Sequence, residues 1–137
     1  MMLLRLLPIM LILFTSKIQA MEFPIEVIEY IDNSRVVAFI NESDIDKTLS
    51  WTPFTSAPPL SLNSALGLIQ KYATSDLKLN NATLSEIELR QIPKHKNYWH
   101  YLVKMQASVD EKMRNYYFIV LMNGKIISGI REPQSIK

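Results

Sequence analysis

The dipeptide Asn123-Gly124, between the runs YYFIVLM and KIISGIR, is the feature that most restricts how this chain can fold. Both residues tolerate the positive φ angles of a type I′ turn, the two-residue turn that best suits a pair of antiparallel strands. The apolar runs on either side contain the β-branched and aromatic residues that favour strands. The dipeptide therefore predicts a β-hairpin made of residues 115–122 and 125–131.

Two more runs of strand-forming residues, 83–92 and 98–109, precede this hairpin. Pro93 and the polar residues up to Asn97 separate these two runs, and a short polar segment leads from the second run into the hairpin. Consecutive strands with short connections pair with their neighbours in the chain. The pattern predicts a four-stranded antiparallel meander.

Residues 62–73 carry apolar side chains at the spacing of one helical stripe. Ser61 is placed to cap the helix N-terminus, and the prolines at 58 and 59 prevent an earlier start. Gly67 costs about 1 kcal/mol relative to alanine inside a helix, so it is either tolerated or lets a strand approach closely. The segment predicts one helix that packs on the meander.

The chain before this helix contains a second hairpin pattern. Residues 25–40 form two β-branched and aromatic runs around the turn-forming residues Asp32, Asn33 and Ser34. We expect an α+β fold in which one helix packs on a four-stranded antiparallel meander and an N-terminal β-hairpin precedes both.

Three prolines between residues 41 and 59 predict an irregular connection from the hairpin to the helix. Trp51 and Phe54 are expected to anchor this connection to the core, because large aromatic side chains bury much area from few residues. We assign the hairpin and connection to residues 21–59 and the helix plus sheet to residues 60–137, together forming a single domain.

The first twenty residues have the layout of a secretory signal peptide. Arg5 precedes an apolar run from Leu6 to Phe14, and a polar tail closes on Ala20. The apolar run is shorter than the roughly 20 residues that cross a bilayer. We expect cleavage near Ala20 and a periplasmic or secreted protein with no membrane span after cleavage, although an uncleaved N-terminal anchor stays open.

Cysteine is absent from the chain, which excludes a disulfide framework and the lipid-carrying cysteine of a bacterial lipoprotein. When Arg5 and Lys17 leave with the signal peptide, 13 of the 15 basic residues remain against 13 acidic ones. Nucleic-acid binding proteins need a basic surface for the phosphate backbone. The neutral mature chain is therefore expected not to bind nucleic acid.

Alternation along residues 98–109 places Trp99 and every second residue toward the helix, and the residues between them on the outer face. The run YYFIVLM is apolar on both sides, which predicts that the N-terminal hairpin, a second copy or a partner covers the outer face. This outer face is the candidate surface for binding a protein or peptide. Its candidate residues are Glu86, Glu88, Arg90, His100, Leu102 and Lys104.

We identify no catalytic, cofactor or metal residues. His95, expected in a loop, and His100, expected to be solvated on a strand, lack a cysteine or nearby carboxylate to complete a zinc site. The three glycines are isolated, so no phosphate-binding loop is present, and no serine or cysteine has a catalytic setting. Glu86 and Glu88 are a carboxylate pair in principle, but nearby basic residues favour surface ion pairs.

In order, the segments LNSALGLIQKYA, LSEIELR, YWHYLVKMQ and YFIVLMNGKIISG resemble the PepSY-type small exported modules, over roughly residues 60–131. In those modules a helix packs on a short antiparallel sheet; here Met122-Asn123 stands where an acidic residue is common before the last turn. The stretch SWTPFTSAPPLSLNSALGLIQKYA is similar to small secreted bacterial proteins of unknown function. The resemblance implies a binding or inhibitory module without catalytic residues.

The sequence thus predicts an exported, non-catalytic module that binds a protein or peptide, for example to restrain an exported hydrolase or toxin. Two alternatives stay open: a small hydrolase or lyase that uses His100 with Glu86 or Glu88, and a structural envelope protein. Cofactors are not expected, and a homodimer is a further option.

Overall fold

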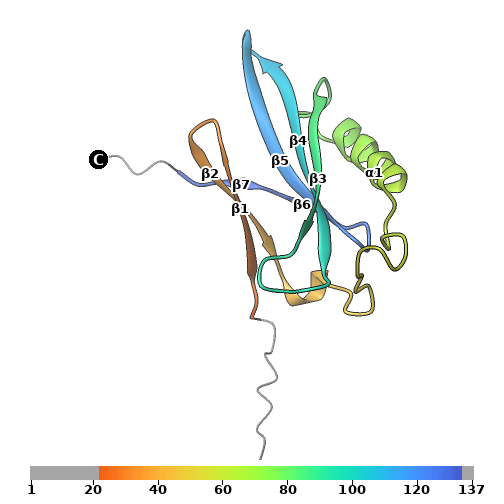
Figure 1. Ribbon diagram of the computed structural model, residues 1–137. Helices are drawn as coiled ribbons and strands as arrows, with labels where there is room; N and C mark the ends of the chain where they lie inside the picture. Colours follow the sequence, from red (N-terminus) through yellow and green to blue (C-terminus); the bar gives the residue numbers. More distant parts are fainter. Residues whose placement is uncertain (1–21, 134–137) are drawn as a thin grey trace, which may run out of the picture.

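The computed structural model describes residues 22–133 of the chain. The predicted signal peptide, residues 1–20, lies outside the described residues, as do residues 134–137. Within the described part, one α-helix and seven β-strands form three layers: the helix, a four-stranded sheet and a three-stranded sheet (Figure 1). The α+β class, the single helix on a four-stranded antiparallel sheet and the N-terminal hairpin are as predicted.

The four-stranded sheet, called sheet B, is an antiparallel meander in the order β3-β4-β5-β6. Its strands are β3 Thr83–Gln91, β4 Trp99–Val109, β5 Lys112–Leu121 and β6 Ile126–Ser128. Strand β5 begins three residues earlier than predicted, because Asp110 and Glu111 form a two-residue turn with φ angles of 52° and 63°.

The three-stranded sheet, called sheet A, has the order β1-β2-β7. Its strands are β1 Ile25–Ile31, β2 Ser34–Ile40 and β7 Ile130–Arg131. The predicted hairpin over residues 25–40 is confirmed. Asp32 and Asn33 form its turn with φ angles of 49° and 60°, the left-handed pair that a type I′ turn requires.

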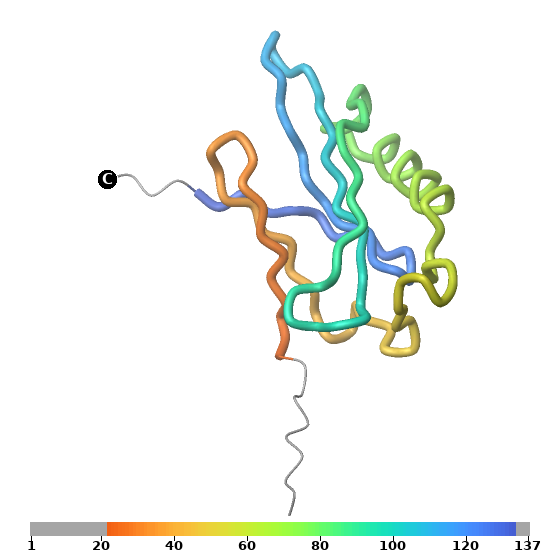
Figure 2. Tube along the Cα trace, viewed as in Figure 1, coloured from red at the N-terminus to blue at the C-terminus, as the bar shows by residue number. Residues whose placement is uncertain are grey.

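The prediction of one strand over residues 125–131 is wrong. The chain leaves sheet B after β6 and joins sheet A as β7, so that Gly129 lies at the crossing (Figure 2). A Cβ atom at Gly129 would lie 2.7 Å from Cγ1 of Val36 and 2.8 Å from the carbonyl oxygen of Tyr117. Only glycine fits where the chain passes between the two sheets.

The hairpin around Asn123-Gly124 is confirmed, but its predicted turn type is wrong. Gly124 has φ of 88°, whereas Asn123 is not among the residues with positive φ. The Leu121 N–H donates to the Lys125 carbonyl and the Gly124 N–H donates to the Leu121 carbonyl, both at 2.9 Å. This is a three-residue loop closed by a glycine bulge. The Asn123 side chain instead donates to the carbonyl oxygen of Asp44 at 3.0 Å.

Helix α1, Leu62–Ser75, begins as predicted: the Ser61 hydroxyl accepts the N–H of Ser64 at 3.1 Å. Its apolar stripe packs on one face of sheet B, with Ala65 and Ile69 in the same buried cluster as Val103 of β4. No atom lies within 4 Å of a Cβ built at Gly67, so the idea that this glycine admits a strand is wrong. No helix in residues 22–133 combines the length and apolar character needed to span a membrane.

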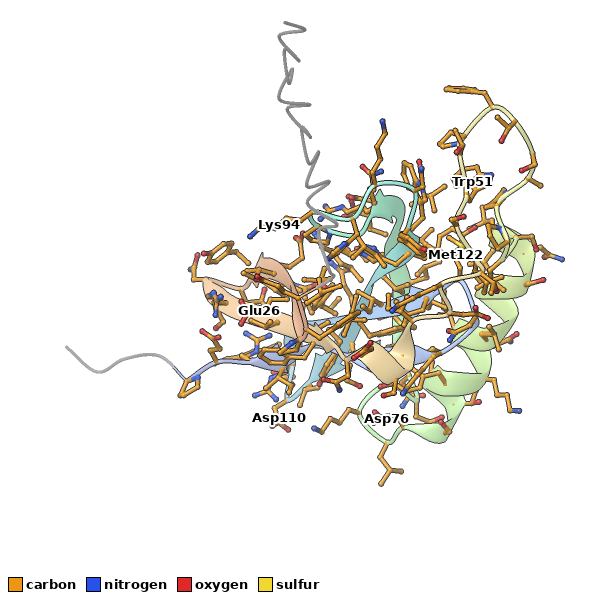
Figure 3. All side chains as sticks on the ribbon, turned by 90° about the horizontal axis from the view of Figure 1, so that it is seen from below. Glu26, Trp51, Asp76, Lys94, Asp110 and Met122 are labelled. Carbon is orange, nitrogen blue, oxygen red and sulfur yellow. The ribbon has the colours of Figure 1, made fainter. Side chains whose placement is uncertain are left out.

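The connection between β2 and α1 contains the 3-10 helix η1, Glu42–Asp44, and is otherwise irregular. Trp51 anchors it as predicted: its ring meets the ring of Trp99 edge-on at 5.3 Å between centroids, and its backbone N–H donates to the Asn97 carbonyl. Figure 3 shows the segment around Trp51 projecting beside the helix.

Phe54, by contrast, is fully exposed, and its predicted role as an anchor is wrong. Thr52 to Thr55 form a β-turn in which the Thr55 N–H donates to the Thr52 carbonyl at 3.4 Å. Phe54 occupies the third position of this turn with φ of 72°, which directs its side chain into solvent.

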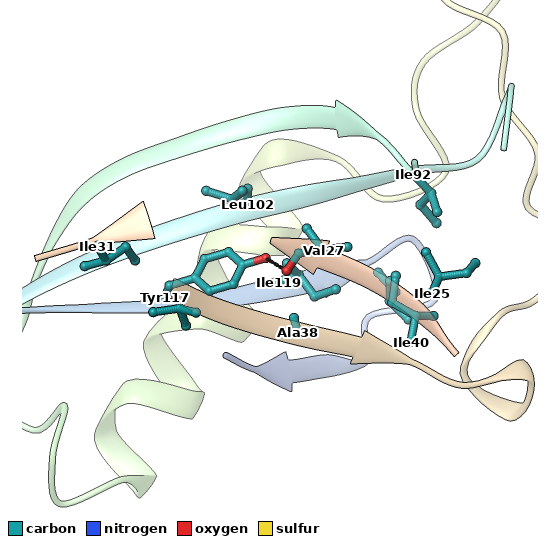
Figure 4. Close-up of a cluster of buried hydrophobic side chains, with 11 residues drawn as sticks. Ile25, Val27, Ile31, Ala38, Ile40, Ile92, Leu102, Tyr117 and Ile119 are labelled. Carbon is teal, nitrogen blue, oxygen red and sulfur yellow. Dashed lines mark hydrogen bonds between the residues drawn. The ribbon is translucent and has the colours of Figure 1, made fainter. Parts of the chain in front are cut away.

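A second buried cluster joins sheet A to the face of sheet B that lies opposite the helix (Figure 4). Val27 of β1 and Ala38 of β2 pack there against Leu102 of β4 and Ile119 of β5. The Tyr117 hydroxyl, buried in this cluster, donates to the Val27 carbonyl at 3.2 Å. Sheet B therefore has one core on each of its two faces.

Candidate functional site

The face predicted to bind a partner is covered by the N-terminal hairpin. Leu102 has no exposed surface and lies in the cluster that β1 and β2 complete. Of the three coverings that the apolar run YYFIVLM allowed, the structure forms the one made by the chain itself. Leu102 is therefore closed to a partner in this structure.

His100 is buried on the same face, and the expectation that it is solvated is wrong. Only 1% of its surface is exposed, and neither ring nitrogen has a hydrogen-bond partner in the described residues. Burial, aided by the positive charge of Arg90, lowers the pKa of His100 from 6.5 to about 4. The ring is neutral at pH 7 and makes no hydrogen bond to Glu86 or Glu88, so the sequence-based catalytic grouping is not assembled.

The charged residues of the predicted face serve to dock sheet A. Glu29 of β1 pairs with Arg90 of β3 and, at 3.4 Å, with Lys104 of β4. Arg90 also pairs with Glu88, and Lys104 lies 3.7 Å from Glu86 as the register predicts. The side chain of Glu29 is only 15% exposed. These predicted site residues thus meet one another and the hairpin.

The two carboxylates of β3 form a pair, although not in a cavity. A hydrogen bond shared between them raises the pKa of Glu86 and, together with Arg90, lowers the pKa of Glu88. His95 lies in the loop between β3 and β4, as expected. Residues 22–133 contain no group of three or more histidine, aspartate or glutamate side chains arranged to hold a metal ion.

A groove of about 1210 Å³ lies elsewhere, beside the first half of β5. We call it the β5-edge groove. The end of α1 and the segment after it form one wall, and sheet A contributes the other. Its lining includes Tyr72, Leu79, Met113, Val36 and Ile130.

The floor of the β5-edge groove is a strand edge that has no neighbouring strand. Strand β6 pairs with β5 only over Phe118–Val120, and the Gly129 N–H adds one bond to the Tyr117 carbonyl. From Lys112 to Tyr116, β5 pairs with β4 alone among the described strands. Sheet B, the middle layer, therefore has no described strand beside this part of β5, although α1 and sheet A line the groove on either side.

Two side chains, one from the β1–β2 turn and one from β7, occupy part of this open edge. The Asp32 carboxylate accepts the backbone N–H of Asn115 at 3.3 Å and its side-chain amide at 2.8 Å. Arg131 donates to the Asn115 carbonyl at 3.3 Å and lies 3.7 Å from Asp32. The hydrogen bond from the Asn115 side chain, followed by the other contacts, lowers the pKa of Asp32.

The groove is lined by more positive than negative side chains. The basic ones are Lys78, Lys112, Arg114 and Arg131, and the acidic ones are Asp32 and Asp76. In residues 22–133 no carboxylate forms a salt bridge with the first three of these basic groups. Asp110 and Glu111 lie at the nearby turn but do not line the groove.

Sequence reasoning missed this groove, because it depends on where β6 stops. Gly129 was the available signal: it interrupts an otherwise continuous strand pattern. Comparison of the chain with protein-family models, with curated proteins and with solved structures finds no match.

Proposed function

We propose that this chain is an exported, non-catalytic module that binds a protein or peptide through the β5-edge groove. The observation that carries the proposal is the edge of β5 over Lys112–Tyr116, which no described strand covers and which lies in a groove between two layers of the fold. Strand edges of this kind are a common site at which proteins take up extended segments. The proposal moves the binding surface from the outer face of sheet B, which the hairpin covers, to the sheet edge.

The size and chemistry of the groove support a macromolecular ligand. Its volume of about 1210 Å³ exceeds the roughly 300–1,000 Å³ typical of small-molecule pockets. Exposed apolar side chains stand at its borders, among them Met113 with 59% of its surface exposed, Leu77 and Ile130. Such side chains supply the apolar contacts of protein interfaces. Restraint of an exported enzyme, as the PepSY resemblance implies, is one activity that such binding serves.

Site-specific photo-crosslinking in the native host tests the proposal. A photoreactive phenylalanine is placed at Met113, inside the groove, or at Glu88, on the sequence-predicted face. The proposal expects a discrete crosslinked product from position 113, competed by unlabelled protein, and none from position 88.

Two results contradict the proposal. A product from position 88 alone returns the binding surface to the outer face and β3. No product from position 113 or from a second groove position, Lys78, shows that the groove does not bind a protein in the cell. Melting curves of each labelled protein establish that it is folded before either result is scored.

A further inference from the structure

We infer that the β5-edge groove binds one extended peptide strand with acidic ends, which completes sheet B by pairing with β5. This inference rests on the proposed function and specifies its ligand. The occupant is a segment of a partner protein, and its recognition combines backbone pairing, apolar contacts on both faces and attraction to the basic rim.

The layers leave a space of the right kind for a strand. Sheet B lies between α1 and sheet A, and its order ends at the short strand β6. A strand added beside Lys112–Tyr116 would place alternate side chains toward Tyr72 and Leu79 on the helix side and toward Val36 on the sheet A side. Both sides of such a strand would therefore meet apolar surface, as in the interior of a sheet.

The backbone of β5 has its free groups on the side of the groove. Ile119 pairs with β6 and the Tyr117 carbonyl accepts the Gly129 N–H, so the backbone groups of odd-numbered residues point to this side. Asn115 and Met113 continue the alternation. The side chains at Asn115 already bind its backbone groups, whereas Met113 lies at the more exposed end of the edge.

Asp32 and Arg131 imitate the missing strand at Asn115. The carboxylate accepts the N–H that a strand carbonyl would accept, and the guanidinium donates to the carbonyl that a strand N–H would reach. Unprotected edges pair with other chains, and charged side chains limit this. Asp32 and Arg131 therefore block the edge of β5 at Asn115, and an incoming strand must displace them there.

The charge on the rim selects the ends of the peptide. Lys78, Lys112 and Arg114 line the groove without salt-bridge partners in the described residues. Acidic residues at the peptide ends would neutralise these groups and accelerate association. Basic ends would meet like charges.

Three synthetic peptides test the inference on the protein produced with its own leader and purified in exported form. DEVTVTVED has alternating side chains and acidic ends, KKVTVTVKK has basic ends, and DEVTPTVED lacks one backbone donor at its centre. Affinity is measured by calorimetry, and protection of the Met113 amide by hydrogen exchange.

We expect DEVTVTVED to bind and to protect the Met113 amide, KKVTVTVKK to bind about tenfold more weakly, and DEVTPTVED not to bind. Asp32→Gly removes one of the two side chains that block the edge, and glycine suits the positive φ of 49° at this turn. This variant is expected to bind DEVTVTVED about threefold more tightly, a change that a purely structural role of Asp32 would not produce.

The inference fails if none of the peptides binds at millimolar concentration, if the acidic and basic peptides bind equally, or if the proline peptide binds as well as the first. It also fails if the protein alone is a dimer whose Met113 amide is already protected, since a second copy then fills the edge. A crosslink from position 113 combined with any of these results retains the proposed function and rejects only the strand as its ligand.

Discussion

The two faces of sheet B are covered in different ways. On the face beneath α1 the buried cluster contains apolar side chains, such as Ile69 and Val103, together with the hydroxyl-bearing Tyr101. On the face beneath sheet A, an apolar cluster lies beside the buried ring of His100 and the ion pairs of Glu29. The helix is held mainly by apolar burial, with one hydrogen bond between the Tyr72 and Ser128 hydroxyls. Sheet A is held by apolar burial and also by ion pairs and by the titratable His100 ring.

This difference determines how each face responds to a perturbation. Apolar burial is non-directional and involves no titratable group, so it changes little with pH. Buried polar and charged groups require correct partners and a correct protonation state. The face beneath sheet A is therefore expected to be the more sensitive one, and the following predictions test that expectation in order of decreasing effect.

The largest effect is expected at the crossing between the two sheets. Gly129→Ala adds a Cβ atom in contact with Tyr117 and Val36, and we expect the free energy of unfolding to fall by about 3 kcal/mol. Gly67→Ala in α1 is the matched control: its Cβ meets no atom, so stability should rise by about 0.5–1 kcal/mol. Urea denaturation measures both, and equal effects at the two glycines would contradict the comparison.

The second effect concerns pH. Because the pKa of His100 is about 4 in the fold and 6.5 unperturbed, its neutral ring favours the folded state fully above pH 6.5, and this contribution is lost as pH falls from 6.5 to 4. The loss amounts to about 3 kcal/mol at about 1.4 kcal/mol per unit. His100→Leu should remove this pH-dependent loss of stability.

Urea denaturation of both proteins at pH 7.5 and pH 4.5 measures this difference, and the carboxylates common to both proteins cancel. We expect the variant to lose less stability than the wild type over this interval. Parallel losses in the two proteins would show that His100 is solvated or has a partner.

The third effect concerns the ion pairs between the sheets. Glu29→Ala leaves Arg90 and Lys104 without their shared partner from β1, and we expect a cost of about 1–2 kcal/mol, since both retain a pair on β3. Glu26→Ala removes a half-exposed pair with Arg35 and should cost at most about 0.5 kcal/mol. If the two variants lose the same stability in urea, Glu29 does not dock the hairpin.

The smallest effect is expected outside both faces, at Phe54. Phe54→Gly removes no buried area and suits the positive φ, so stability should stay within about 0.5 kcal/mol of the wild type. Trp51→Ala, which removes the edge-on contact with Trp99 and so a support of the helix face, should cost about 2 kcal/mol. A thermal melt that shows a large loss for Phe54→Gly would restore this residue as an anchor.

Features that depend on neighbours in the sequence were predicted well. The helix N-terminus at Ser61, the turn at Asp32-Asn33 and the alternation along β4 follow from short-range patterns. The turn at Asn123 shows the limit of such patterns: its side chain binds the distant Asp44 carbonyl, and the turn takes a different form from the one the dipeptide favours.

The candidate site was predicted less well, because alternation assigns a side chain to a face but does not say what covers that face. The six residues assigned to the outer face do lie at their expected register positions. His100 and Leu102 are nevertheless buried, since sheet A lies over them. The β5-edge groove was missed because it depends on where β6 ends, after Ser128, whereas the strand prediction continued to residue 131.

The sequence by itself thus determined the class of the fold, the helix, the strands and most of their order, because periodicity and turn chemistry act over a few residues. The tertiary structure alone decided that the chain crosses between sheets at Gly129, that sheet A covers His100, and that β5 has an open edge. Each of these features joins segments far apart in the chain, such as Asp32 with Asn115. Their stability depends on how whole layers pack, which no local pattern encodes.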